Sequence, residues 1–251
     1  MKEFQMNNKD ENIFRNHFDK ESYEYINKYG KKNVTGHSFR TRRKLALEML
    51  TTQNIGELLD IGGGPGVYLP LFKDRVSSYY LVDISSKMIE QAKKQNSGGI
   101  PYICQISSVY ELAFDNNQFD TVLAMGLFEY LDSPKMALKN IKRVTKKGGN
   151  ILVSFPNQNS PMRKWSNFIY KITNRSTPFA SKMFTLLEVI EMAKELKLSI
   201  INIKGYNAQL LPFPFTWKFE RIAYYSARIL EPLLNNFGKM WGTSFIVKFR
   251  K

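Results

Sequence analysis

The stretch ELLDIGGGPGVYLPLF, residues 57–72, carries the pattern that determines the fold. A short apolar segment runs up to Asp60, Gly62, Gly64 and Gly66 follow at alternate positions, and an apolar helical segment comes next. Glycine is needed where a chain turns tightly and where a ligand must approach the main chain closely. Taken alone, this strand, turn and helix is as typical of an ordinary tight turn as of a nucleotide-type site.

A second acidic residue adds context to the glycine turn. Asp83 lies 23 residues beyond Asp60, in the segment LVDIS, where an acid can accept hydrogen bonds from both hydroxyls of a ribose. Dinucleotide enzymes use the spacing G-x-G-x-x-G, which brings a helix N-terminus to a pyrophosphate. Here the spacing is G-x-G-x-G and an acid precedes it, so a sulfonium cofactor with a cationic amino group fits better than a phosphate.

The surrounding chain alternates short apolar runs with helical patterns, which is typical of βαβ units and a parallel sheet. Strands are predicted at 56–61, 79–83, 102–105, 119–124, 150–155, 199–204 and 244–249. Helices are predicted at 12–28, 38–50, 87–95, 161–172, 186–196 and 219–234, and one more begins at 133–134. In that last helix we expect Met136, Ala137, Ile141 and Val144 to face inward and Gly148-Gly149 to end the helix.

Composition limits the classes of protein. A chain of 251 residues fits one domain, and a single cysteine, Cys104, excludes an internal disulfide and a Cys-rich zinc cluster. We find no secretory signal at the N-terminus and no apolar run long enough to span a membrane, so a cytoplasmic location is expected. The net charge is +15, and residues 160–251 hold 15 Lys and Arg against 5 Glu. An anionic partner would therefore bind the C-terminal third.

Residues 57–157 resemble the core of the class I S-adenosylmethionine-dependent methyltransferases, particularly those acting on small molecules. The resemblance includes the segment QFDTVLAMGLFEYLDSPKMALKNIKRVTKKGGNILVSFPN, residues 118–157. It implies an α/β fold: a doubly wound, Rossmann-like, mostly parallel seven-stranded sheet with helices on both faces and a reversed final strand. It also implies a single methyltransferase domain over 1–251, with lid helices in 1–52, a cofactor-binding core in 53–157 and a C-terminal half in 158–251 that carries substrate-lid insertions at 158–185 and 207–242.

The resemblance implies a site for S-adenosyl-L-methionine. Asp60 and the glycine turn would hold its amino-acid moiety, Asp83 its ribose, and Ile84 and Met88 would flank its adenine. Ser108 stands where the family commonly has an Asp that accepts from the adenine amino group, so that contact is assigned to Ser108 or to the backbone of the next residue. The complete predicted cofactor set is Asp60, Gly62, Gly63, Gly64, Gly66, Asp83, Ile84, Met88, Ser108, Val109 and Met125, and no metal ligand is predicted.

The candidate catalytic residues are Tyr130 and His37. Methyl transfer is an in-line displacement, so a base is needed only when the acceptor loses a proton early. Many relatives have Glu-His after the fourth strand, where this chain has Glu129-Tyr130. In the N-terminal helices, the lid contacts are predicted to be Tyr25, Tyr29, Phe39 and Arg40; in the alternative interpretation Arg40, Arg42 and Arg43 form a solvated basic face.

The leading hypothesis is an enzyme that methylates a small or lipid-like metabolite at an oxygen. The alternatives are an RNA methyltransferase and a catalytically silent cofactor-binding protein. Nucleic acid is disfavoured because the position after the fourth strand reads MGLFEY rather than the D/N/S-P-P-Y/F motif of enzymes that grip a flipped base. Aromatic residues with basic neighbours at 163–171 and 213–221 are typical of a core or a substrate lid, and also of peripheral membrane contact.

Overall fold

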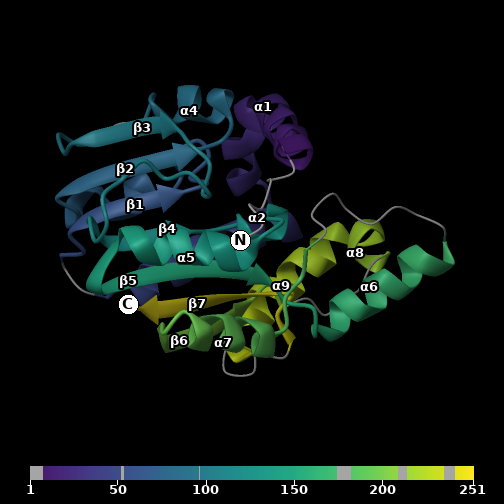
Figure 1. Ribbon diagram of the computed structural model, residues 1–251. Helices are drawn as coiled ribbons and strands as arrows, with labels where there is room; N and C mark the ends of the chain where they lie inside the picture. Colours follow the sequence, from purple (N-terminus) through teal and green to yellow (C-terminus); the bar gives the residue numbers. More distant parts are fainter. Residues whose placement is uncertain (1–7, 52–53, 96, 174–181, 209–213, 235–240) are drawn as a thin grey trace.

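A seven-stranded sheet forms the centre of the computed structural model, which describes residues 8–51, 54–95, 97–173, 182–208, 214–234 and 241–251 (Figure 1). The strand order is β3-β2-β1-β4-β5-β7-β6. Strands β1 to β5 pair in parallel, and β7 runs antiparallel to both β5 and β6. The predicted fold class is therefore confirmed, including the reversed final strand. The strands are β1 (Glu57–Ile61), β2 (Ser78–Asp83), β3 (Tyr102–Ile106), β4 (Phe119–Ala124), β5 (Thr145–Pro156), β6 (Ser199–Tyr206) and β7 (Ser244–Arg250).

Helices cover both faces of this sheet. Neighbouring residues of one strand belong to different cores: Leu58 packs in one hydrophobic cluster and Leu59 in the other, and both are fully buried. A parallel sheet covered on both faces is expected to have such continuous apolar strands. The helices are α1 (Asn8–Gly30), α2 (Val34–Met49), α3 (Leu69–Phe72), α4 (Ser86–Ala92), α5 (Pro134–Val144), α6 (Pro161–Ile172), α7 (Leu186–Glu195), α8 (Phe215–Lys218) and α9 (Glu220–Leu234). In the described part of the chain, no helix has the length and apolar character needed to cross a membrane.

Two details of the predicted α5 region were wrong. The helix ends at Val144, and Gly148 and Gly149 lie inside β5, next to a register irregularity between β4 and β5. A side chain at Gly149 would meet the Asp120 carbonyl oxygen at 2.9 Å, so this glycine permits close strand pairing rather than a helix end. Met136 is 41% exposed, and Leu138 takes the buried position on that face.

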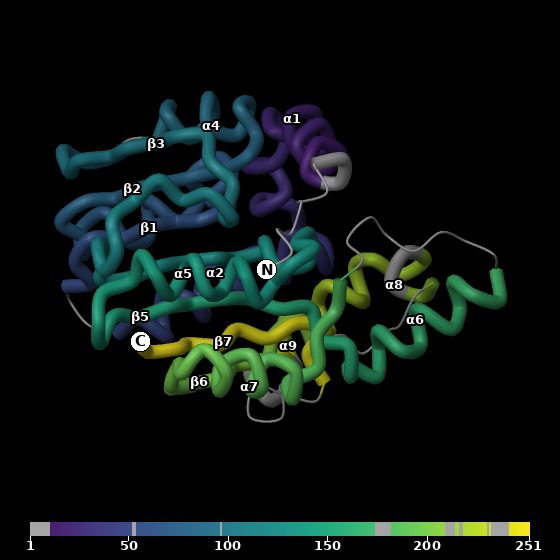
Figure 2. Tube along the Cα trace, in the orientation of Figure 1, coloured from purple at the N-terminus to yellow at the C-terminus, as the bar shows by residue number. Residues whose placement is uncertain are grey.

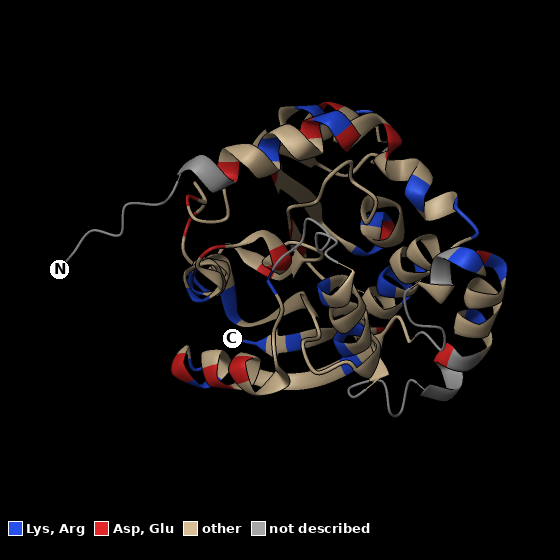
Figure 3. Cartoon of the chain, turned by 90° about the vertical axis from the view of Figure 1, so that its right-hand side faces the viewer, with Lys and Arg blue, Asp and Glu red and all other residues tan. Residues whose placement is uncertain are grey.

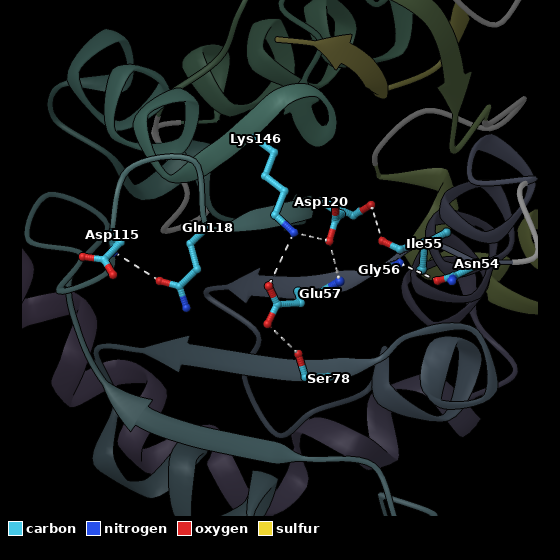
Figure 4. Close-up of polar contacts among 10 residues, drawn as sticks. Asn54, Ile55, Gly56, Glu57, Ser78, Asp115, Gln118, Asp120 and Lys146 are labelled. Carbon is cyan, nitrogen blue, oxygen red and sulfur yellow. Dashed lines mark hydrogen bonds and ion pairs between the residues drawn. The ribbon is translucent and has the colours of Figure 1, made fainter.

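The amino ends of the strands are joined by a polar network on the edge away from the cofactor turn (Figure 4). Lys146 Nζ lies 2.8 Å from Asp120 Oδ2 and 3.5 Å from Glu57 Oε2. Asp120 also accepts a hydrogen bond from the Glu57 N–H at 2.9 Å. These side chains are more than a third exposed, so the network aligns three strands while contributing little net stability.

The sheet order places the expected site at one crevice. Strand β1 lies between β2 and β4, so the strand order runs to one side of β1 through β2 and β3 and to the other side through β4 and β5. Ligands of such sheets bind at the carboxyl ends of the strands, beside the point where the order reverses. Helix α1 lies across the carboxyl ends of β1, β2 and β3 (Figures 1 and 2). The cofactor turn, which follows β1, therefore opens towards α1.

Candidate active site

A pocket, partly open to solvent, lies at the carboxyl ends of the central strands. Its walls come from α1 and from the ends of β1, β2, β3 and β4 and the segments that follow them. The lining residues are Glu11, Phe14, Phe18 and Tyr25 from α1; Ile61, Gly62 and Gly64 after β1; Asp83, Ile84 and Met88 after β2; Ser107, Ser108, Val109 and Tyr110 after β3; and Gly126, Leu127, Tyr130, Leu131 and Asp132 after β4.

The N–H groups of the glycine turn are used within the protein. Proline at position 65 has none, and the four glycine N–H groups donate as follows: Gly62 and Gly63 to the Val82 carbonyl at 2.8 and 3.2 Å, Gly64 to Asp83 Oδ2 at 2.9 Å, and Gly66 to the Gly63 carbonyl at 3.1 Å. A phosphate site requires free N–H donors. The turn therefore lacks the free N–H donors that a phosphate needs, and a sulfonium cofactor with a cationic amino group has no such requirement.

Two of these glycines are required for different physical reasons. Gly64 has a φ of +54°, and a side chain there would meet only Met88 Sδ, at 3.9 Å, so the space above it is open to a ligand. Gly63 lies against the sheet, where a Cβ would be 2.6 Å from the Leu81 side chain and 2.9 Å from Asp60 Oδ2. The missing side chain at Gly64 therefore leaves room for a ligand, while the missing side chain at Gly63 lets the turn pack closely against the sheet.

Asp83 lines the cavity and has both oxygens fixed by the backbone. Oδ2 accepts from the Gly64 N–H and Oδ1 from the Ser85 N–H, each at 2.9 Å. Burial raises the pKa of Asp83 to about 6, although these backbone hydrogen bonds oppose the rise. Each carboxylate oxygen can accept a second hydrogen bond, so an ionised Asp83 has the capacity to bind two ribose hydroxyls.

Asp60 lies beneath the turn and does not line the cavity. It is 1% exposed, and Oδ2 accepts from the Tyr79 hydroxyl at 2.8 Å. Burial raises its pKa to about 7. Asp60 therefore contacts the buried side of the turn and is not part of the cavity surface.

The predicted cofactor residues divide into two groups. Those that line the cavity are Gly62, Gly64, Asp83, Ile84, Met88, Ser108 and Val109; those that do not are Asp60, Gly63, Gly66 and Met125. Gly66 is needed for packing, since a Cβ there would be 2.8 Å from the Tyr102 hydroxyl. Met125 is 4% exposed and belongs to a hydrophobic core.

Tyr130 lines the cavity, in contact with α1. Its ring packs edge-on against Phe14 and Phe18, with centroids 5.3 and 5.1 Å away. Burial raises the pKa of Tyr130 well above the ordinary value for tyrosine. The phenol is therefore protonated at neutral pH, so it is suited to donate a hydrogen bond and unsuited to act as a base.

The structure places His37 away from the cavity lining. Its Nε2 pairs with Glu231 of α9, which also accepts from Thr41 Oγ1 at 3.0 Å and from the Asn207 N–H at 2.6 Å. Glu231 thus joins α2 to α9 and to the segment after β6. His37 belongs to this structural junction.

Arg42 contradicts the interpretation of a solvated basic face. It is 6% exposed, and a Cβ at Gly126 would lie 2.3 Å from its Nη1, so the guanidinium lies directly behind the cavity wall. Its Nε has no hydrogen-bond partner among the described residues. Burial raises the pKa of the nearby Glu129 carboxyl, and the positive charge of Arg42 opposes that rise. Helical spacing marks Arg42, because it shares the buried face of α2 with Leu45, Ala46 and Met49.

The lid prediction placed some contacts correctly and missed others. Tyr25 lines the cavity, but Tyr29 is buried behind it, and Arg40 donates to the carbonyls of Tyr29 and Lys31 at the end of α1. Missed were Glu11, Phe14 and Phe18, which lie with Tyr25 at spacings of three, four and seven, on one helical face. Tyr110 and Asp132 were also missed, and nothing in their local pattern distinguishes them from ordinary loop residues.

The fold and the site define an enzyme that binds an adenosyl sulfonium cofactor at the switch point of a doubly wound sheet. Comparison with known proteins agrees. A family model described as a methyltransferase domain matches residues 59–153. An uncharacterized protein of Methanocaldococcus jannaschii is 32% identical over 152 residues, 60% of this chain and 67% of that protein. The chain belongs to the S-adenosylmethionine-dependent methyltransferases, and S-adenosylmethionine is its cofactor.

Two further similarities bear on the site. A phosphatidylethanolamine N-methyltransferase of Cereibacter sphaeroides is 32% identical over 101 residues, 39% of this chain and 49% of that enzyme, so the match spans about half its length. The magnesium protoporphyrin IX methyltransferase of Synechocystis PCC 6803, solved with SAH bound, superposes with a TM-score of 0.68 at 14% identity. That superposition covers 96% of this chain and 99% of the other and reports a shared fold.

Proposed function

We propose that the chain transfers a methyl group from S-adenosylmethionine to an oxygen of a small or lipid-like metabolite. The observation that carries the proposal is the lining of the cavity. It combines apolar and aromatic side chains with three carboxylates, Glu11, Asp83 and Asp132, and has no Lys or Arg among its described residues. Such a lining disfavours an anionic acceptor, and its apolar and aromatic part provides surface for an apolar one.

The residues present fit the cofactor. The glycine turn would receive its amino-acid moiety, Asp83 would accept from its ribose hydroxyls, and Ile84 and Met88 would flank its adenine beside Ser108 and the Val109 backbone. Arg42, a buried cation with an unsatisfied Nε behind Gly126, would add a positive charge behind the pocket wall for its carboxylate. When bound, the cofactor supplies an electrophilic methyl group.

The chain's own contribution is to position the acceptor and exclude water. Phe14 and Phe18 of α1 close the cavity against Tyr130, whose protonated hydroxyl is available to donate to the acceptor. A hydroxyl acceptor must lose its proton as the new bond forms, and the carboxylates of Glu11 and Asp132 in the lining can accept it. Methyl transfer also requires the acceptor to lie in line with the sulfonium, so positioning of the acceptor would contribute to the rate.

The lining also disfavours RNA. A polynucleotide is held mainly through its phosphates by Lys and Arg, and the described cavity wall presents carboxylates instead. The phosphatidylethanolamine N-methyltransferase that resembles this chain is named for a lipid acceptor, which supports the lipid-like class. We therefore rank a lipid-like metabolite above RNA.

The test is transfer of radiolabelled methyl from S-adenosylmethionine to three pools: a lipid extract, a deproteinised aqueous extract and total RNA. We expect label in lipid or small molecules, in a base-stable ether or a base-labile ester, and much less label with Asp83→Asn at a cofactor concentration below the wild-type Kd. Label in RNA would overturn the proposal. Cofactor binding by calorimetry without transfer to any pool would instead favour a catalytically silent protein.

A further inference from the structure

Helix α6 presents an apolar face to solvent. Trp165, Phe168 and Ile172 are 44%, 55% and 60% exposed, and their spacing of three and four puts them on one side of the helix. The helix has no buried residue. Exposure excludes a core position for Trp165 and Phe168, while their role in a substrate lid stays a prediction. An array of this kind marks an interaction surface, whereas single exposed apolar residues do not.

Cations line one edge of that face. Lys164 and Lys171 are both exposed, seven residues apart, and each lies next to one of the apolar positions. No Asp or Glu occurs in α6. An apolar strip bordered by lysines is the composition of a helix that lies in a membrane interface.

Helix α9 repeats the arrangement. Ile222, Tyr225 and Ile229 are 60%, 54% and 68% exposed, again at spacings of three and four. Arg221 and Arg228 are exposed, seven residues apart, along one edge. The opposite face of α9 is buried through Ala223, Tyr224 and Ala227. Two separate helices thus share one pattern, which argues against chance.

Both helices lie at the end of the molecule to which the carboxyl ends of the strands point (Figure 1), the end that Figure 3 shows face-on. Helix α6 follows β5 directly, and Arg163 Nη2 donates to the Thr243 carbonyl just before β7 at 3.1 Å. Helices α6 and α9 therefore lie at the same end of the sheet as the cavity.

We propose that the exposed faces of α6 and α9 dock the protein on an anionic lipid membrane. Charge complementarity selects this occupant. A second copy of the chain would bring its four cations against the four of the first copy. RNA would pair with the cations, but it binds through bases stacked on aromatic rings and would leave the aliphatic Ile172, Ile222 and Ile229 without a partner. Anionic lipid headgroups pair with the cations, and the acyl boundary accepts the apolar side chains. Trp217, an aromatic residue of the segment 213–221 for which membrane contact is one prediction, lies outside the residues whose side chains are described.

The test is sedimentation of the full chain with phosphatidylcholine vesicles, with and without phosphatidylglycerol. We expect binding only to the anionic vesicles, weakening as salt rises. Lys164→Gln/Lys171→Gln should lower the partition coefficient about 30-fold, since each cation near such a surface contributes about fivefold. Phe168→Ser/Ile172→Ser and Ile222→Ser/Ile229→Ser should each lower it by about tenfold or more.

Matched controls separate this surface from general charge and general apolarity. Lys139→Gln/Lys194→Gln removes the same charge from exposed positions on α5 and α7, and Leu187→Ser/Ile190→Ser removes exposed apolar residues from α7. Equal losses in the controls would overturn the proposal. So would equal binding to neutral vesicles, a dimer in sedimentation velocity that Phe168→Ser/Ile172→Ser abolishes, or RNA binding in place of vesicle binding. The measurement needs neither cofactor nor acceptor, so its failure is distinct from failure of the proposed function.

Discussion

The substitution Asp60→Asn tests how the cofactor turn is supported. Asp60 is 1% exposed beneath the turn, and burial raises its pKa from 3.8 to about 7 while the hydrogen bond from Tyr79 partly opposes the rise. Because its pKa is higher in the folded protein than in the unfolded chain, the folded state binds the proton more tightly. Stability is therefore greatest at low pH and is lost as the pH rises from about 4 through 7.

The magnitude follows from the two pKa values. A tenfold difference in proton affinity corresponds to about 1.4 kcal/mol, so an ionised Asp60 costs the folded state on the order of 4 kcal/mol. About 1.4 kcal/mol of this is lost between pH 6 and pH 8. Asp83, with a pKa of about 6, adds only about 0.4 kcal/mol in that interval, because most of its loss occurs at lower pH.

Urea unfolding of the cofactor-free protein at pH 6, 7 and 8 measures this effect. The free energy of unfolding of the wild type should fall relative to that of Asp60→Asn by about 1.4 kcal/mol across the range, since asparagine does not titrate. Tyr79→Phe should make the fall steeper, because loss of the Tyr79 hydrogen bond raises the pKa of Asp60 further. Parallel pH profiles for the wild type and Asp60→Asn would refute the reasoning.

Four further substitutions test the turn and its cover. Asp83→Asn should lower the affinity for S-adenosylmethionine by about 10- to 100-fold in calorimetry, because an amide cannot accept both backbone N–H groups and the ribose; unchanged affinity would contradict the assignment. Gly63→Ala should lower the free energy of unfolding in urea by about 1–3 kcal/mol, because its Cβ would lie 2.6 Å from the Leu81 side chain. Gly64→Ala should lower it by about 1–2 kcal/mol and also remove most cofactor binding. A larger loss of cofactor affinity in Gly63→Ala than in Gly64→Ala would contradict the geometry of the turn. Asp19→Ala removes the α1 carboxylate that accepts from the Ser85 hydroxyl at 2.6 Å and from the Lys87 N–H at 3.2 Å, at the start of α4. Amide hydrogen exchange in α1 should accelerate and cofactor affinity should fall about fivefold. An unchanged exchange rate would show that other contacts hold α1 over the pocket.

Much of the sheet could be predicted because its strands are short, apolar and separated by clear turns. The strand predicted at 119–124 coincides with β4, and that at 244–249 lies within one residue of β7. The prediction of a helix end at Gly148-Gly149 failed for a physical reason. Glycine permits both a helix end and a close strand pair, and only the partner strand β4 decides between them.

The site was less predictable than the sheet, because cavity walls combine segments far apart in the chain. Periodicity marks the face of α1 that carries Phe14 and Phe18, but does not show that this face covers a cavity rather than a core. The burial of Arg42 depends on Gly126, more than 80 residues away, which has no side chain to displace it. A pattern within one helix cannot contain that information.

The hydrogen bonds of the glycine turn explain why its spacing and its charge belong together. Gly62 and Gly63 of the turn donate to the Val82 carbonyl of the neighbouring strand, so neither N–H group is available to an anionic ligand such as a pyrophosphate. Asp60 beneath the turn adds negative charge once ionised, which would repel that ligand and attract a cationic cofactor. A bound cation would in turn favour the ionised form of Asp60, the form that weakens the empty fold. We therefore expect the carboxylate that destabilises the protein near neutral pH to contribute to the selectivity of the site for a cation.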